Sequence, residues 1–142
     1  MIDHIWTVLC SRVVVDIESQ NLSIQNVLEQ LNLAAEPAPD LVIGIPYDIA
    51  SFWVRSEADT PAKGRSRITL VDPSGAATSI VEMAIDLTQV ERARHRIHCS
   101  GLRATGPGRY VFRVELLDDG QSDWRLVASV PLRIIFSPPR GG

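Results

Sequence analysis

Hydrophobic and polar residues alternate along most of the chain. The alternation has a period of two and recurs in short segments separated by Gly, Pro, Asp, Asn and Ser. A β-strand places successive side chains on opposite faces, so this pattern indicates strands with one buried face. Many short strands divided by turn residues are typical of a sandwich. We therefore expect an all-β fold, an antiparallel β-sandwich of about eight strands, immunoglobulin-like or C2-like, with at most one short helix.

The clearest predicted strands stand at the two ends of the chain. Residues 2–15 are rich in β-branched and aromatic side chains, and Arg12 indicates a bend between two shorter strands. Alternating residues at 110–116 lead through a turn into residues 124–136, which predicts a hairpin. Pro131 has no main-chain donor, so it predicts an edge strand or a bulge in the last strand.

Two segments leave a choice between strand and helix. Residues 22–31 match a helical spacing as well as a strand, and we interpret them as a strand with a bulge near Asn26, because a hairpin back onto the first strand covers its edge. Residues 87–92 fit a short helical turn. Between these segments, residues 34–40 contain Pro37 and Pro39 and predict a loop.

Composition supports one folded domain. The chain has 142 residues, of which 45% are hydrophobic, and this is enough to bury a core without disulfides or a metal. We expect one domain over residues 1–136 and a flexible tail at 137–142. The first residues lack a basic segment and no apolar run approaches the roughly 20 residues of a spanning helix, so we expect a cytoplasmic protein with no membrane association.

The two cysteines are too few for a disulfide framework, and we interpret both as buried thiols. The order Cys10, Trp53, Cys99 is that of an immunoglobulin domain. In such domains, however, a corner tyrosine precedes the second cysteine, whereas Tyr110 follows Cys99. We interpret residues 108–110 as a turn that leads into a strand, with the phenol of Tyr110 capping a nearby carbonyl.

Both ends of the chain resemble a known group of sequences. The similar segments are TVLC at 7–10, VVVD at 13–16, NLSIQNVLEQL at 21–31, GRYVFRV at 108–114 and ASVPLRI at 128–134. These segments resemble a widespread family of small uncharacterised bacterial proteins that carry a domain of unknown function. The resemblance extends over both ends, roughly half of the chain, and the middle contributes little. The resemblance implies a β-sandwich and a bacterial cytoplasmic origin. It implies no activity, cofactor or site residue.

Two groups of residues suggest metal ligands. The first is His95, His98 and Cys99, but residues three apart on a strand and direct neighbours point to opposite faces, so we expect no metal site there. The second comprises turn acids, which sandwich domains can gather around calcium. Hairpin turns also use aspartates to bind their own backbone, and we favour that role. These acids are Asp72, Asp118, Asp119 and Asp123.

Known catalytic motifs are missing from the sequence. It contains no nucleophile elbow, phosphate loop, zinc-protease helix or dinucleotide-binding glycine pattern. We therefore expect neither catalytic residues nor a cofactor. A catalytic group assembled from distant positions stays open as an alternative.

Charge is distributed unevenly along the chain, whose net charge is -3. Residues 13–62 hold eight acids and one base, Arg55, a balance of -7. Residues 92–113 hold six arginines and no acid, a balance of +6. The six are Arg92, Arg94, Arg96, Arg103, Arg109 and Arg113.

Such an arginine-rich stretch has three interpretations. A charged patch can steer and orient a protein partner or a second copy of the chain. It can bind nucleic acid or another polyanion, although the negative net charge makes this less favoured. It can also be neutralised within the monomer or guard a strand edge against aggregation. Our leading hypothesis is a non-catalytic protein–protein interaction or assembly module that binds through the arginines, with polyanion binding as the alternative.

Overall fold

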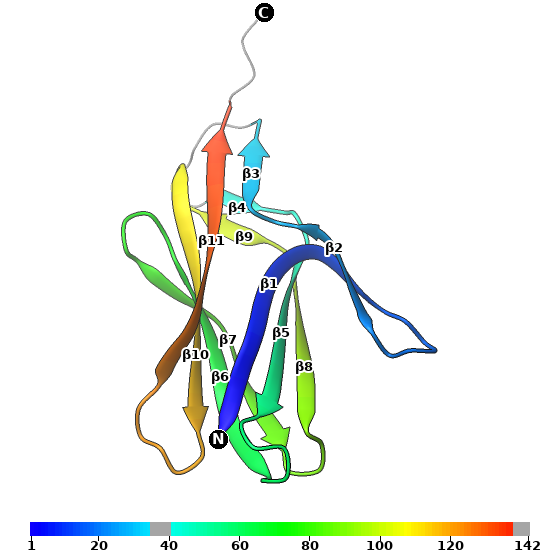
Figure 1. Ribbon diagram of the computed structural model, residues 1–142. Helices are drawn as coiled ribbons and strands as arrows, with labels where there is room; N and C mark the ends of the chain where they lie inside the picture. The colour runs from blue at the N-terminus through cyan, green and yellow to red at the C-terminus, as the bar shows by residue number, and fades with distance from the viewer. Residues whose placement is uncertain (35–40, 138–142) are drawn as a thin grey trace, which may run out of the picture.

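The computed structural model describes residues 1–34 and 41–137, and within these residues it has eleven strands and no helix (Figure 1). The strands are β1 (Ile2–Val15), β2 (Leu22–Val27), β3 (Gln30–Leu33), β4 (Leu41–Ile43), β5 (Tyr47–Arg55), β6 (Ala62–Val71), β7 (Ala77–Leu87), β8 (Arg92–Cys99), β9 (Leu102–Ala104), β10 (Gly108–Asp118) and β11 (Arg125–Phe136). The all-β prediction is confirmed, and the predicted number of strands is too low. Most of the predicted loop 34–40 and tail 137–142 lies outside the described residues.

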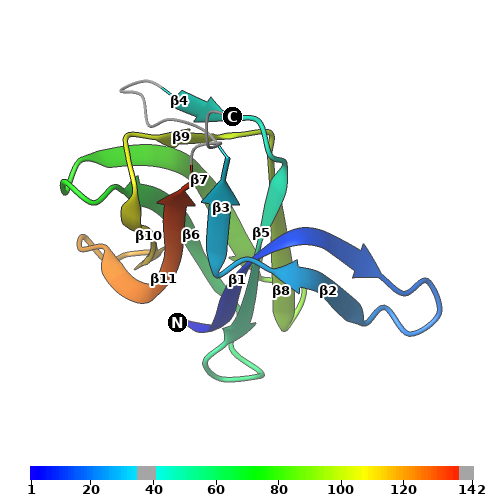
Figure 2. The ribbon, with the colours of Figure 1, turned by 90° about the horizontal axis from the view of Figure 1, so that it is seen from above.

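The strands form three sheets. Sheet A has the order β2-β1-β5-β8, sheet B the order β3-β11-β10-β6-β7, and sheet C pairs β4 with β9. Viewed from above, the β1–β2 hairpin extends away from the other strands (Figure 2). All pairs are antiparallel except β3 with β11. The prediction of a wholly antiparallel fold is therefore wrong at β3, because the chain leaves sheet A after β2 and joins sheet B beside its last strand.

The core collects side chains from all three sheets. Its largest fully buried members include Trp53 of sheet A and Tyr110 and Phe112 of sheet B. In β10, alternate residues from Tyr110 to Leu116 are buried, as their spacing predicts. The Tyr110 hydroxyl donates to Gly106 O at 2.6 Å and accepts from Thr105 N at 3.0 Å, so the predicted carbonyl cap is confirmed.

The two ambiguous segments contain no helix. Residues 22–31 form β2 and the start of β3, and Asn26 adopts a φ of 55°. The partners on both sides of Asn26 keep one register, so the irregularity is a left-handed residue rather than a bulge with a register shift. At residues 87–92, Arg55 donates to the carbonyls of Leu87 and Thr88, which supplies their hydrogen bonds without a helical turn.

Pro131 lies neither on an edge strand nor at a bulge, so the prediction of one or the other is wrong. β11 lies between β3 and β10, and its register with β10 is regular at Val111↔Pro131. The pairing of β11 with β3 starts only at Arg133. The side of β11 that faces β3 is therefore unpaired at Pro131, which is why a residue without an N–H fits there.

β1 is one strand with two partners, which refines the bend predicted at Arg12. It pairs with β5 up to Cys10↔Asp48 and with β2 from Cys10 to Val15. No helix long and apolar enough to cross a membrane occurs in the described part of the chain.

Candidate functional site

The register of sheet A places side chains in rows across its outer face, the face away from the main core. β1, β5 and β8 contribute one residue each to every row. The rows are Trp6, Phe52 and Arg94; Val8, Ala50 and Arg96; and Cys10, Asp48 and His98. The β1 and β5 positions are mostly apolar and the β8 positions are cationic or polar, so apolar surface and positive charge meet along β8.

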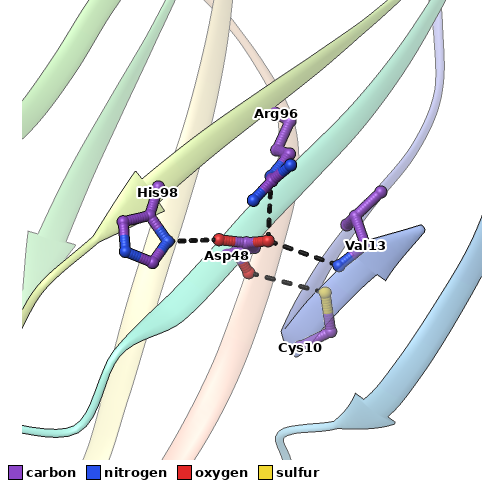
Figure 3. A network of polar contacts seen from close by, with 5 residues as sticks. All are labelled: Cys10, Val13, Asp48, Arg96 and His98. Carbon is purple, nitrogen blue, oxygen red and sulfur yellow. Dashed lines mark hydrogen bonds and ion pairs between the residues drawn. The ribbon is translucent and has the colours of Figure 1, made fainter. Parts of the chain in front are cut away.

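Asp48 is the buried charge of this face, with a side chain only 2% exposed (Figure 3). Its Oδ2 accepts hydrogen bonds from Arg96 Nε at 3.0 Å and from the main-chain N–H of Val13 at 3.3 Å. Its Oδ1 lies 2.8 Å from His98 Nδ1. A buried carboxylate needs such partners, because burial of an uncompensated charge is costly.

The local fold explains why an aspartate occupies this position. β1 stops pairing with β5 at Cys10↔Asp48, and the N–H of Val13 lies just beyond that pair. The Asp48 carboxylate accepts this N–H in place of a main-chain carbonyl. Burial alone would raise the pKa of Asp48. The hydrogen bond from His98, the charge of Arg96 and the Val13 N–H outweigh burial and hold the pKa below its ordinary value.

The cluster also orients His98 and leaves Cys10 inert. An ionised carboxylate only accepts hydrogen bonds, so His98 Nδ1 carries a proton and Nε2 is directed away from Asp48. Cys10 Sγ donates to Asp48 O at 3.8 Å, and burial together with the Asp48 charge raises the pKa of its thiol. A protonated, buried thiol is a poor nucleophile. Within the described residues, no hydroxyl or thiol is hydrogen-bonded to His98.

The structure divides the six predicted arginines among three sheets. Arg92, Arg94 and Arg96 lie on the outer face of β8, while Arg103 lies on β9. Arg109 and Arg113 lie on β10, on the outer face of sheet B. The expectation of one arginine face is therefore wrong for three of them, because the strands that carry the six arginines enter different sheets.

The three arginines of β8 differ in their partners. Arg96 is paired with Asp48, which makes the predicted neutralisation between the acidic and basic stretches correct for this pair. Arg94 Nη2 donates to the main-chain carbonyl of Gln20 in the β1–β2 turn, at 2.7 Å. Arg92 makes no hydrogen bond or ion pair with any residue that the structure describes. Two of the three therefore keep their positive charge uncompensated by a carboxylate within the described residues.

A groove of about 810 Å³ lies between the β1–β2 turn and β8. Trp6 and Phe52 line it, with ring centroids 5.7 Å apart, and so do Arg92 and Arg94. Neither aromatic residue was among the candidate site residues predicted from the sequence. Their alternation indicated a shared face of each strand, but only the pairing of β1 with β5 brings them together.

The candidate metal ligands do not converge. His95 lies on the inner face of β8 with its ring 6.4 Å from Trp53, and His98 lies on the outer face. Asp72 accepts N–H bonds from Ser74 and Ala76 of its own turn. In residues 1–34 and 41–137, no three His, Cys, Asp or Glu side chains are placed to hold one metal ion.

Asp118 and the two cysteines, which the sequence also marked as candidates, take structural positions. Asp118 accepts the Ile2 N–H at 2.9 Å and pairs with Arg125 at 3.1 Å, which ties the start of β1 to sheet B. Both cysteines are free thiols; Cys10 is buried and Cys99 is half-buried, so the prediction of buried thiols is confirmed fully for Cys10 only.

Known proteins offer limited similarity. No protein-family model matches the chain, and no curated protein does. Among solved structures, a β-glucosidase from Listeria innocua in complex with glucose is 12% identical with a TM-score of 0.46, over 76% of this chain and 15% of that one. A family 123 glycoside hydrolase from Clostridium perfringens is 10% identical with a TM-score of 0.45, over 94% and 27% of the two chains. An alkylpurine DNA glycosylase from Pseudomonas fluorescens, bound to DNA containing an abasic site analog, is 15% identical with a TM-score of 0.38, over 91% and 30%.

Proposed function

We propose that this protein is a non-catalytic protein-interaction module and that its binding surface is the outer face of β8. This surface consists of the outward side chains Arg92, Arg94, Arg96 and His98. The observation that carries the proposal is that Arg92 and Arg94 face solvent without a carboxylate partner among the described residues, on an edge strand. The proposal also includes a cytoplasmic setting and an immunoglobulin-like or C2-like sandwich, as the sequence suggests.

Charge complementarity favours an acidic partner. Exposed charges of one sign accelerate encounter with a surface of the other sign and exclude partners of the same sign. The guanidinium group suits this role, since its planar fork binds a carboxylate through two nitrogen atoms.

Asp48 prepares the surface for binding. It uses Nε of Arg96, so the two terminal nitrogens of that half-exposed guanidinium make no hydrogen bond with a described residue. It also fixes the ring of His98 through Nδ1. Side chains that are already ordered lose less conformational entropy when a partner binds.

The decisive experiment reverses the charge of the two β8 arginines that have no carboxylate partner among the described residues. The double variant R92E/R94E and the matched control R109E/R113E change the net charge equally, but only the first alters β8. Arg96 is left unchanged because its replacement would also disturb Asp48. Quantitative affinity capture from the native cell should lose its specific partners with R92E/R94E and keep them with R109E/R113E, with light scattering as the readout for self-association. Equal results for the two variants would refute the proposal.

A second candidate is single-stranded nucleic acid, favoured by one observation. Trp6 and Phe52 stand in the same row as Arg94, and aromatic rings beside cations are what nucleic-acid bases and phosphates contact in non-specific binding. This candidate predicts that a labelled oligo-dT binds with an affinity that falls steeply with salt and falls again in Trp6→Ala. Retention of full affinity in Trp6→Ala would exclude base stacking there.

A further inference from the structure

We infer that β8 binds its partner by antiparallel strand addition, and that the partner contributes an extended segment in which acidic and apolar residues alternate. This inference rests on the proposed function and specifies how the surface is used. Three features of β8 support it: an open main-chain edge, the alternation of its side chains, and the incompatibility of β8 with a second copy of itself.

The first feature is the open edge. β8 is the last strand of sheet A, and no described strand pairs with its other side. Arg55 N donates to Glu91 O at 2.9 Å, and these residues lie opposite one another in the β5–β8 register. In an antiparallel pair, hydrogen-bonded and non-hydrogen-bonded positions alternate. Counting from Glu91, the main-chain groups of Arg92, Arg94, Arg96 and His98 therefore point away from β5, toward the open edge.

The second feature is the alternation of side chains along β8. The residues with free main-chain groups carry outward, exposed side chains, while Ala93 and Ile97 point inward, half-buried against the core. A strand added at this edge would continue both faces. Its residues opposite the arginines would lie on the outer face, where carboxylates complement them. Its intervening residues would lie beside Ala93 and Ile97, where apolar side chains extend the core.

The third feature excludes a second copy of β8 as the added strand. Residues that exchange main-chain hydrogen bonds in an antiparallel pair lie directly opposite one another. On β8 these are the residues with cationic or imidazole side chains. Two copies of β8 could therefore pair only with arginine or histidine opposite arginine or histidine, and like charges in opposite positions destabilise a strand pair. The same arginines that attract an acidic segment keep the protein from pairing with itself here.

The test uses a synthetic probe with the full-length chain. The probe is a fluorescein-labelled peptide with the alternating sequence Thr-Glu-Val-Glu-Val-Glu-Val-Thr, and binding is followed by fluorescence anisotropy. One derivative carries N-methyl groups on the Glu amides, which would face β8, and a second carries them on the Val amides, which would face away. A third peptide has the same composition with the Glu and Val residues in separate blocks.

Strand addition predicts a distinct order of affinities. N-methylation at Glu should weaken binding at least about tenfold, as expected for the loss of more than one main-chain hydrogen bond, while N-methylation at Val should have little effect. The block peptide should bind weakly. Arg94→Glu should reduce the affinity of the alternating peptide at least about tenfold, and Arg113→Glu should not.

Two outcomes would overturn the inference and leave the proposed function standing. Unchanged affinity of both N-methylated peptides would mean that charge alone holds the segment. No binding of the alternating peptide would mean that the open edge of β8 does not accept an added strand of this kind. Failure of the proposed function would instead appear in the capture experiment, as equal partner recovery from R92E/R94E and R109E/R113E.

Discussion

The outer faces of sheets A and B both carry arginines, but in different surroundings. On sheet B, Arg67 donates to both carboxylate oxygens of Glu115 at 3.1 Å each, and its guanidinium lies 4.2 Å from the centre of the Trp124 ring. Arg65 pairs with Glu82 at 2.9 Å. On sheet A, Arg96 is the only arginine paired with an acid among the described residues, and this acid is buried.

This difference shows that the number of arginines does not predict free positive charge. Arg65 and Arg67 lie within a stretch of mixed charge, and the antiparallel neighbours of β6 supply an acid to each. β8 has only one neighbour within its sheet, and the β5 positions opposite Arg92 and Arg94 are Val54 and Phe52. Arg92 and Arg94 keep free charge because an edge strand is paired on one side only. The residues opposite them on that side are apolar.

Replacement of Arg96 should change the stability of the protein more than replacement of any other arginine of β8. Arg96→Glu would place a second carboxylate beside buried Asp48 and should lower the free energy of unfolding by about 2–3 kcal/mol, less than for a fully buried pair because Arg96 is 56% exposed. Urea denaturation at pH 7 measures this change. Arg94→Glu is the matched control on the same strand, and a similar loss there would mean that Asp48 is not responsible.

Replacement of the acid should have the next largest effect, and it depends on pH. Asp48→Asn should lower the free energy of unfolding at pH 7 by about 1–2 kcal/mol, since an amide accepts weaker hydrogen bonds. Because the folded-state pKa of Asp48 is below its unfolded value, its contribution is complete above about pH 4 and is lost as the pH falls further. The difference between wild type and Asp48→Asn should therefore shrink below pH 4 in urea titrations. Asp123→Asn, at an exposed residue, is the control, and a pH-independent difference for Asp48→Asn would contradict this account.

On sheet B, removal of one paired arginine should have a smaller effect. Arg67→Ala loses the paired hydrogen bonds to Glu115 and the contact with Trp124, which should cost about 1 kcal/mol because Arg67 is partly exposed. Thermal unfolding and tryptophan emission follow this change. Arg67→Lys, which keeps the charge without the planar fork, should recover only part of the stability. Full recovery by lysine would show that charge alone matters at this position.

The smallest effect on stability is expected where charge is free. R92E/R94E should change the free energy of unfolding by less than about 0.5 kcal/mol, because neither arginine has a carboxylate partner among the described residues and the bond from Arg94 to Gln20 O is exposed to solvent. Urea denaturation again gives the measurement, beside the binding experiments proposed above. A loss as large as that of Arg96→Glu would indicate that these arginines stabilise the fold rather than bind a partner.

The all-β fold and the shared face of the β8 arginines were predictable from the sequence. The contact of Asp48 with Arg96 was not. Alternation at Arg92, Arg94 and Arg96 predicted their common face, and that spacing is local. Asp48 lies more than forty residues away, and nothing in its own neighbourhood indicated that it would be buried beside Arg96. That contact depends on which strands are neighbours, and period-two patterns do not specify strand order.

Strand order also accounts for two predictions that the structure contradicts. Closeness in sequence predicts one patch of six arginines, but β9 and the turn after it carry the chain from sheet A to sheet B between Arg96 and Arg109. Likewise, the apolar residues of 22–33 gave no sign that β3 would join β11, because a strand of four residues has too little pattern to identify its partner.

The pairing of β3 with β11 also bears on how the molecule folds. Their register joins Gln30 to Arg133, so about one hundred residues separate partners that lie side by side. Closure of such a long loop is slow relative to the formation of local hairpins. During synthesis, β1 and β2 can form their hairpin early, whereas β3 has no partner until β11 has left the ribosome. We therefore expect β3 to be the last strand protected from hydrogen exchange during refolding, after the local hairpin of β10 with β11 has formed.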